Sequence, residues 1–262
     1  MNPRFELDGR PVSPDVQHLL TLAGYGHFTA MQVRDRRTRG LDLHLTRLDN
    51  ASRELFGTGL DGGRVRAHIR HALGDDVSDA SVRVYVFSPS GPDASGSDVS
   101  LLVSVKAPGE GPRTPQRLLA VPWQRPVAHI KHTGSFGQAY YGRHAELNGY
   151  DDALLTGPDG TISEGAIANL CGWDGSTVVW PDAPFLHGIT MQLLERGLAE
   201  QGIPSVWRPV FVRDLRAFEG VFLTNSRGIA AVERVDDVSL PVATGFLKTL
   251  VDIYDSAPWD LI

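Results

Sequence analysis

The sequence predicts an α+β fold in two domains, a small N-terminal α/β domain and a larger C-terminal domain that forms a pseudo-barrel. Three observations support this prediction. The chain has 262 residues, of which 42% are hydrophobic, and this is enough to bury one large core or two smaller ones. Strand-like and helix-like stretches are mixed along its length. The stretch PGEGPRTPQR holds three prolines and two glycines and is typical of a linker, so we expect domains over 1–106 and 118–262 with a linker over 107–117.

The first half contains alternating strands and two amphipathic helices. Asp8-Gly9 predicts a hairpin turn, and a second strand pair is expected over 26–43 around an arginine-rich turn. Leu45, Leu48 and Leu55 share a helical face that ends at Gly57. A further helix over 63–73 and strands over 81–89 and 99–107 complete this half.

The second half reads as a meander with three helices. A strand over 118–123 leads to an apolar-leaning run that looks like a strand and delivers Lys131. Asp159-Gly160 and Asp174-Gly175 predict tight turns between short strands. Helices are expected over 135–148, over 188–201 with Thr190 as N-cap and Gly202 as stop, and over 243–256.

Composition excludes several classes of protein. The net charge is −6 and no basic stripe carries interleaved aromatics, so we expect no nucleic-acid partner. No run is long and apolar enough for a membrane span, no signal-peptide core is present, and the single Cys171 suits the cytoplasm. His68 and His71 share a helix and His129 and His132 flank Lys131, but no cysteine or acidic cluster completes a metal site, so we expect none. Phosphate-loop, dinucleotide and serine-hydrolase motifs are missing.

Lys131 is the first candidate for chemistry, since lysine occurs only at positions 106, 131 and 248. A lysine that enters an apolar environment loses hydration, its pKa falls, and the neutral amine can form a Schiff base with a carbonyl. The alternative is a lysine whose stem is buried and whose ammonium reaches the surface.

Other residues supply a carboxylate and anion-binding groups. Glu164 follows a strand and precedes small residues, which leaves room for a pocket, although the stretch taken alone favours a solvated turn. Gly188, Ile189 and Thr190 open a helix whose free N–H groups favour a phosphate. Thr224, Asn225 and Ser226 form a polar turn, and Arg47 can clamp a phosphate or make a surface ion pair. A lysine for an aldehyde, a carboxylate for a ring nitrogen and these anion-binding groups are what pyridoxal phosphate needs.

The order and spacing of these pieces resemble the class IV aminotransferases, which are the fold-type IV pyridoxal-phosphate enzymes and include branched-chain and D-amino-acid aminotransferases and aminodeoxychorismate lyase. The resemblance runs from about Gly24 to about Val235. Its pieces are GHFTAMQV, HLTRL, the lysine segment, GYDDALLTGPDGTISEGAIANL, LHGIT and LTNSRGIAAV, of which the E-G-x-x-x-N-L motif from Glu164 is the most specific.

The resemblance implies a role for each matching residue. Lys131 would carry the Schiff base and move the proton, Glu164 would pair with the pyridine nitrogen, and Leu186 would pack on the ring. Arg47 would bind the phosphate with help from Gly188, Ile189, Thr190 and Ser226.

The substrate side departs from the family pattern. Phe136 stands where several relatives have a tyrosine, Thr29 where branched-chain enzymes have a glutamate, and Ser81 where they have a tyrosine, although Arg83 remains. The substrate pocket implied by the resemblance consists of His27, Thr29, Arg83, Phe136 and Arg227.

We therefore expect a pyridoxal-phosphate-dependent aminotransferase that moves an amino group between an amino acid or amine and a keto acid through a Schiff base at Lys131. The resemblance also implies a homodimer. Two alternatives stay open, a lyase that eliminates from its substrate as aminodeoxychorismate lyase does, and a cofactor-binding protein with little turnover.

Overall fold

The computed structural model describes residues 3–12, 24–89 and 99–262. They form two compact units. The first comprises Met1–Gly109, Ile130–Gly134 and Pro258–Ile262, and the second comprises Glu110–His129 and Ser135–Ala257. Two short segments thus lie outside the domain assigned to them from sequence. Ile130–Gly134, which contains Lys131, joins the first unit because His132 bridges His27, and the C-terminal strand joins it by pairing with residues 37–39.

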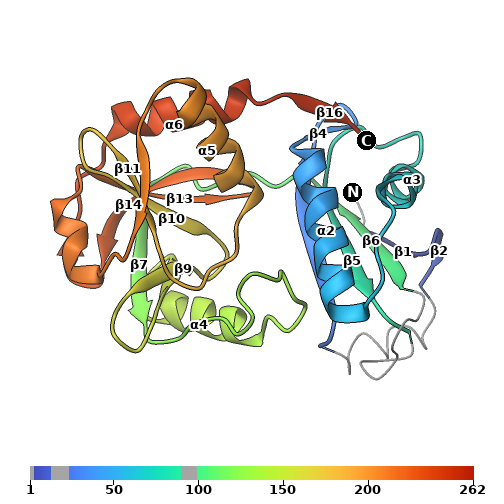
Figure 1. The fold of residues 1–262 in the computed structure, drawn as a ribbon, viewed down its shortest axis with the longest axis horizontal. Helices are drawn as coiled ribbons and strands as arrows, with labels where there is room; N and C mark the ends of the chain where they lie inside the picture. Colours follow the sequence, from blue (N-terminus) through green and yellow to red (C-terminus); the bar gives the residue numbers. More distant parts are fainter. Residues whose placement is uncertain (1–2, 13–23, 90–98) are drawn as a thin grey trace. The chain divides into compact units, whose positions relative to one another are not determined.

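The first unit is built on a five-stranded antiparallel sheet in the order β2-β1-β6-β5-β3 (Figure 1). The alternation expected for residues 81–89 is present, since Val82, Val84 and Val86 are buried while Arg83 is exposed. A two-stranded ladder, β16-β4, lies outside this sheet. The strands are β1 (Arg4–Leu7), β2 (Arg10–Pro11), β3 (His27–Val33), β4 (Arg37–Arg39), β5 (Ala80–Phe87), β6 (Ser100–Lys106) and β16 (Trp259–Leu261).

Two helices cover one face of this sheet, α2 (Leu41–Phe56) and α3 (Gly62–Leu73). Leu48 of α2 and Ile69 of α3 are fully buried in the same cluster as the inward valines of β5 and β6, so one core lies under both helices. Gly57 ends α2 with a φ of 68°, a left-handed conformation that glycine adopts without a steric penalty. Asp61 begins α3 by accepting hydrogen bonds from two N–H groups of its first turn.

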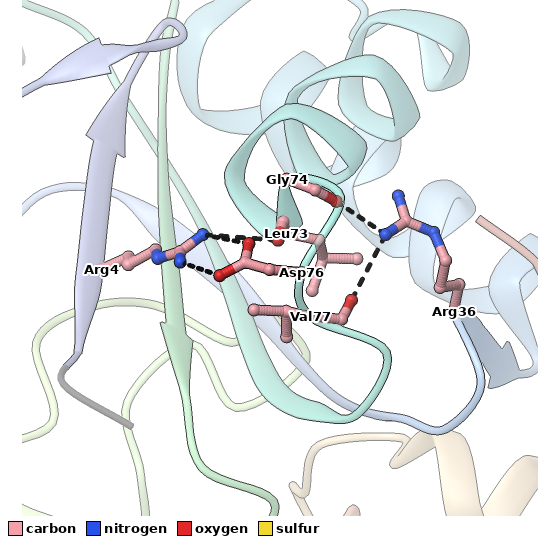
Figure 2. A network of polar contacts seen from close by, with 6 residues as sticks. All are labelled: Arg4, Arg36, Leu73, Gly74, Asp76 and Val77. Atoms are coloured by element: carbon pink, nitrogen blue, oxygen red, sulfur yellow. Dashed lines mark hydrogen bonds and ion pairs between the residues drawn. The ribbon is translucent and has the colours of Figure 1, made fainter.

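Two arginines bind the C-terminal end of α3, as Figure 2 shows. Arg4 donates to the Leu73 carbonyl and forms a two-pronged ion pair with Asp76, while Arg36 donates to the carbonyls of Gly74 at 2.7 Å and Val77 at 3.3 Å. The last carbonyls of a helix have no partner within it, so these cations satisfy them and complement the helix dipole. Arg36 is therefore a structural residue of the arginine-rich turn.

The second unit is built on a nine-stranded sheet in the order β12-β11-β10-β13-β14-β7-β8-β9, with β15 paired to β14. A tight turn, in which Gly165 N–H donates to the Ala168 carbonyl at 2.7 Å, joins β9 at one end of the sheet to β10 near the other end, so the sheet curves as a half-barrel. The strands are β7 (Gln116–Val121), β8 (Asp152–Thr156), β9 (Ile162–Gly165), β10 (Asn169–Trp173), β11 (Val178–Pro181), β12 (Ser205–Arg208), β13 (Gly220–Asn225), β14 (Gly228–Val235) and β15 (Val238–Ser239).

Helices pack on the outside of this sheet (Figure 1). The helix α4 (Phe136–Leu147) covers β7 and β8, while α5 (Ile189–Glu200) and α6 (Thr244–Ser256) pack against each other over Trp180 and Phe222. A short 3-10 helix, Val212–Ala217, adds Leu215 to the cluster of inward apolar residues that fills the half-barrel. No helix in the described ranges is both long and apolar enough to cross a bilayer.

Candidate active site

Glu164 is a buried carboxylate at the end of β9. The Asp159-Gly160 turn returns the chain from β8 to β9, and Gly160 adopts a φ of 83° there. The residue is only 6% exposed, and its Oε2 accepts a hydrogen bond from the Leu186 N–H at 3.2 Å. A buried charge is stable only when it is paired and hydrogen-bonded, so Glu164 is not a solvated turn residue but part of a built site.

The partner of Glu164 is Arg125, which sequence reasoning missed. Arg125 Nε lies 3.2 Å from Glu164 Oε1, close enough for an ion pair though not aligned as a hydrogen bond, and the guanidinium donates to the Ala128 carbonyl. Both side chains are more than nine-tenths buried. Burial lowers the pKa of Arg125 and the Glu164 charge opposes that shift. The signal that could have identified it was an arginine two residues before the apolar-leaning run that leads to Lys131.

The helix α5 begins at Ile189, and the residue that precedes it, not Thr190 as expected, is its N-cap. Gly188 is the N-cap, and no side chain caps the helix. The first N–H groups of any helix lack partners within it, so those that follow Gly188 are open to an anion. Thr190 is buried, and its hydroxyl donates to the Asn225 carbonyl at 2.7 Å instead of capping its own helix. This contact connects α5 to residues 35 positions further along the chain, which local patterns do not reveal.

The turn after β13 lies beside this helix start. Thr224 is 1% exposed, and its hydroxyl has no hydrogen-bond partner among the described residues. Arg227 N–H donates to the Asn225 side chain at 2.8 Å, which holds the two-residue turn of Ser226 and Arg227. An uncapped helix start, an unpartnered buried hydroxyl and a polar turn together fit a phosphate group.

Asn169 locks the loop before α5. Its side-chain amide donates to the Leu186 carbonyl at 2.7 Å, while the Leu186 N–H is held by Glu164. The two bonds clamp Leu186 from both sides. A Cβ placed on Gly188 would lie 2.0 Å from Asn169 Oδ1, so the backbone approach also requires glycine here.

Gly188→Ala is accordingly expected to destabilise the second unit. The added methyl displaces the Asn169 amide and leaves the buried Leu186 carbonyl unpaired, a loss of about 1–3 kcal/mol. Urea unfolding measures the effect, and Gly245→Ala serves as control because a Cβ there meets nothing within 4 Å and alanine is the better helix former. Equal stability of the two variants would contradict the clamp.

Lys131 lies after a turn and not on a strand. Residues 126–130 turn because Val127 adopts a left-handed φ of 47°, and a strand cannot pass through that conformation. The Lys131 carbonyl accepts from the Phe28 N–H at 2.8 Å, and its Nζ lies 4.8 Å from the centre of the Phe28 ring. The side chain is half-buried. An aromatic face next to the amine is the partly apolar setting expected for it.

Arg47 and Lys131 belong to one cationic neighbourhood in the first unit. Burial is the main cause that lowers the pKa of His44 to about 3. The positive charges of Arg47 and then Lys131 act in the same direction. Thr29 Oγ1 bonds His44 Nδ1 at 2.6 Å and is fully buried. His27 is buried likewise and bonds the Ser52 hydroxyl at 3.0 Å. His27 and Thr29, both candidates for the substrate pocket, thus make bonds beneath α2.

The remaining candidates are exposed. Arg83 is on β5 and reaches the Tyr85 hydroxyl at 3.3 Å. Phe136 opens α4, is 81% exposed and stacks on Tyr140. Arg227 lies in the β13–β14 turn and is exposed. The structure thus gathers Glu164, Leu186, Gly188, Ile189, Thr190 and Ser226 in one corner of the second unit, and Lys131 with Arg47 in the first.

A second acid, the half-buried Asp152, begins β8. Burial is the main cause that raises its pKa from 3.8 to about 6, and Arg227 partly opposes it. The folded protein therefore binds a proton more tightly here than the unfolded chain does. This proton binding stabilises the fold fully at a pH below the pKa of Asp152 in the unfolded chain. The stabilisation is lost as the pH rises through about 6, and the loss amounts to roughly 3 kcal/mol.

Asp152→Asn is expected to raise the free energy of unfolding at pH 8 and to leave it unchanged near pH 4. An asparagine oxygen can still accept the hydrogen bonds that reach Asp152 from the N–H groups of Ala153 and Ile167. Urea unfolding at the two pH values measures the difference. A variant equally stabilised at both would show that the carboxylate charge is not the cause.

Comparison with known proteins gives the family. The Amino-transferase class IV model matches residues 26–235. A hypothetical aminotransferase from Mycobacterium tuberculosis in its PLP-bound form has a TM-score of 0.78 at 22% identity, over 91% of this chain and 90% of that one. A branched-chain aminotransferase from Thermoproteus uzoniensis has a TM-score of 0.82 at 20% identity, over 96% and 93%. A putative 4-amino-4-deoxychorismate lyase from Legionella pneumophila has a TM-score of 0.80 at 22% identity, over 88% and 91%.

The chain belongs to the class IV aminotransferase family, since the match spans most of its length. No curated protein matches it. The solved structures share the fold, at identities that support no closer statement. The expected fold class, family, class of enzyme and cofactor, pyridoxal phosphate, are confirmed.

Proposed function

We propose that the protein transfers an amino group from an amino acid or amine to a keto acid, with Lys131 as the residue that holds pyridoxal phosphate covalently. The observation that carries the proposal is the corner around Leu186. There the buried Glu164 carboxylate, the uncapped start of α5 and the Thr224–Ser226 turn are tied together by hydrogen bonds. When bound, pyridoxal phosphate supplies an aldehyde for an amine to attack and a ring that accepts the electron pair released at the substrate Cα.

Each residue of this proposal acts through its own chemistry. Lys131 would hold the cofactor covalently through its amine and, once released by the substrate amine, would take up the proton that leaves the substrate Cα. Glu164 keeps the ring nitrogen protonated, and Arg125 keeps Glu164 charged despite its burial. Leu186 packs on the ring face.

The phosphate is bound by N–H groups at the start of α5, by the turn after β13 and by Arg47. The residues proposed for this role are Arg47, Gly188, Ile189, Thr190 and Ser226. Helix starts and arginine fit phosphate because they offer N–H donors with positive potential. The Thr224 hydroxyl is a further donor, since it is buried without a partner among the described residues.

We further infer that two copies associate through α4. Phe136, Tyr140 and His144 form a row of stacked rings on its surface, and Leu147 at its end is 70% exposed. Contiguous apolar surface of this kind is usually covered by a partner. We place the protein in the cytoplasm because its single Cys171 is a free, buried thiol.

A lyase is the second candidate function. The likeness to a putative 4-amino-4-deoxychorismate lyase favours it. The two reactions end differently. A transaminase leaves its cofactor in the amine form after one half reaction, whereas a lyase releases a keto product and regains the aldehyde form.

A spectroscopic screen with L-amino acids, D-amino acids and (R)- and (S)-amines tests the proposal. A transaminase loses the absorbance of its lysine-bound cofactor with a suitable donor and regains it with a keto acid. Retention of that absorbance together with released pyruvate would support the lyase. A yellow protein that no donor bleaches would be a binding protein, and a protein that takes up no cofactor would overturn all three.

A further inference from the structure

A cavity of about 500 Å³ lies at one end of the half-barrel in the second unit. Its wall is formed by α4, the first residues of β7, β8 and β14, the turn between β9 and β10, and the end of β13. Pockets for small molecules range from roughly 300 to 1,000 Å³ and combine apolar walls with a few polar groups. Ala166 and Leu223 are apolar here, and Asp152, Gln138 and Arg227 are polar.

The charges in this wall are paired with two exceptions. Arg143 and Glu146 bind each other at 2.9 Å, and Asp151 binds Arg117 at 3.1 Å. Asp152 and Arg227 make no ion pair within the described part of the chain, although the Arg227 charge acts on Asp152 through space. A cavity lined by one carboxylate and one guanidinium that are not paired with each other is complementary to a ligand that carries both charges.

Gln138 adds an acceptor to the carboxylate side. The residue is 9% exposed, and its Oε1 is buried with no hydrogen-bond partner among the residues described. Buried polar atoms nearly always have a hydrogen-bond partner. A buried acceptor without one in a cavity wall therefore indicates that a ligand supplies the donor. Asp152 and Gln138 together need several N–H groups, which an ammonium group supplies.

The cavity borders the corner proposed for the cofactor. Asn225 lines the cavity, and its carbonyl accepts the Thr190 hydroxyl bond at the start of α5. Ala166, also in the wall, follows Glu164 by two residues. A molecule that reacts at the cofactor can therefore extend into this space.

We propose that this cavity selects an amino acid with a second, distal amine, whose carboxylate pairs with Arg227 and whose distal ammonium binds Asp152 and Gln138. This specificity rests on the proposed aminotransferase function. The half-buried Asp152 carboxylate favours a cation over an apolar side chain, because an apolar end would cover it without pairing its charge.

The test uses 5-aminopentanoate and pentanoate, which differ only in the distal amine. Both are titrated calorimetrically into holoenzyme reduced with borohydride, so that no turnover occurs. We expect 5-aminopentanoate to bind at least about tenfold more tightly, as a charge-assisted hydrogen bond provides. In Asp152→Asn the ratio of the two affinities should fall to near one. In Arg227→Met the binding of both ligands should weaken.

Glu146→Gln is the matched control, because it removes a neighbouring carboxylate that already has a partner, and the ratio should persist in it. Equal binding of the two ligands, or a ratio unchanged in Asp152→Asn, would overturn the proposal. Failure of the aminotransferase assignment shows separately, as absence of a borohydride-fixed adduct. If no adduct forms but the untreated protein still prefers 5-aminopentanoate over pentanoate, the cavity is an ω-amino-acid site in a protein that does not transaminate.

Discussion

Lys131→Ala is expected to abolish covalent attachment of pyridoxal phosphate and to slow the amino-donor half reaction by at least about 1,000-fold, since both the nucleophile and the proton carrier are lost. Borohydride treatment followed by peptide mass mapping should find an adduct at position 131 in the wild type and none in the variant. An adduct elsewhere would overturn the assignment of Lys131.

The fold should survive this change. The bond from Phe28 N–H goes to the main-chain carbonyl of residue 131, which alanine retains. The contact of Nζ with the Phe28 ring contributes only about 0.5–1 kcal/mol. Circular dichroism and urea unfolding should therefore be close to wild type, which separates lost chemistry from lost structure.

Lys106→Ala is the matched control. Lys106 also lies over an aromatic ring, at 5.9 Å from the centre of Phe5, and is exposed. Its loss should leave both the adduct and the half-reaction rate unchanged. A similar decrease in both variants would mean that the half reaction depends on overall charge and not on one amine.

Local patterns predicted those features that depend on neighbours in sequence. The alternation of residues 81–89 gave the correct buried face of β5, and Gly57 gave the correct end of α2. The motif from Glu164 to Leu170 identified the carboxylate, and its Asn169 proved to hold Leu186. Each follows from side-chain periodicity, backbone preference or a short motif, which are properties of the sequence itself.

Contacts between distant residues were not predictable in the same way. Thr190 has the composition of an N-cap, yet its hydroxyl bonds a carbonyl 35 residues away and a glycine caps the helix. The run before Lys131 has strand-like composition, but the left-handed Val127 turns it. Arg125 and Glu164 lie 39 residues apart, and nothing local connects them. Tertiary contacts decided all three cases.

The Arg125–Glu164 pair provides the second large expected effect. Arg125→Met keeps the length and apolar stem of the side chain but removes its charge. The buried Glu164 then loses the cation that pairs with its Oε1, and loss of one member of such a pair costs about 3–5 kcal/mol. Urea unfolding should register this decrease in the free energy of unfolding. A decrease below about 1 kcal/mol, as for an exposed pair, would contradict the role given to Arg125.

Activity should fall in the same variant for a separate reason. A carboxyl group without its cation takes up a proton more readily, and a neutral acid does not stabilise a protonated ring nitrogen. Glu164→Gln removes the charge directly and should slow the half reaction on the order of 100-fold while the cofactor stays attached to Lys131. Wild-type rates in Glu164→Gln would exclude Glu164 as the partner of the ring nitrogen.

The double variant Arg125→Met, Glu164→Gln separates stability from catalysis. Removing both charges also removes the buried carboxylate that Arg125→Met deprives of this cation, so the free energy of unfolding should recover by about 2–3 kcal/mol relative to Arg125→Met alone. The half-reaction rate should not recover, because no negative charge faces the ring nitrogen. If both properties recovered together, the pair would serve only the fold. If stability alone recovers, Arg125 maintains in the protein interior the charge that the reaction uses.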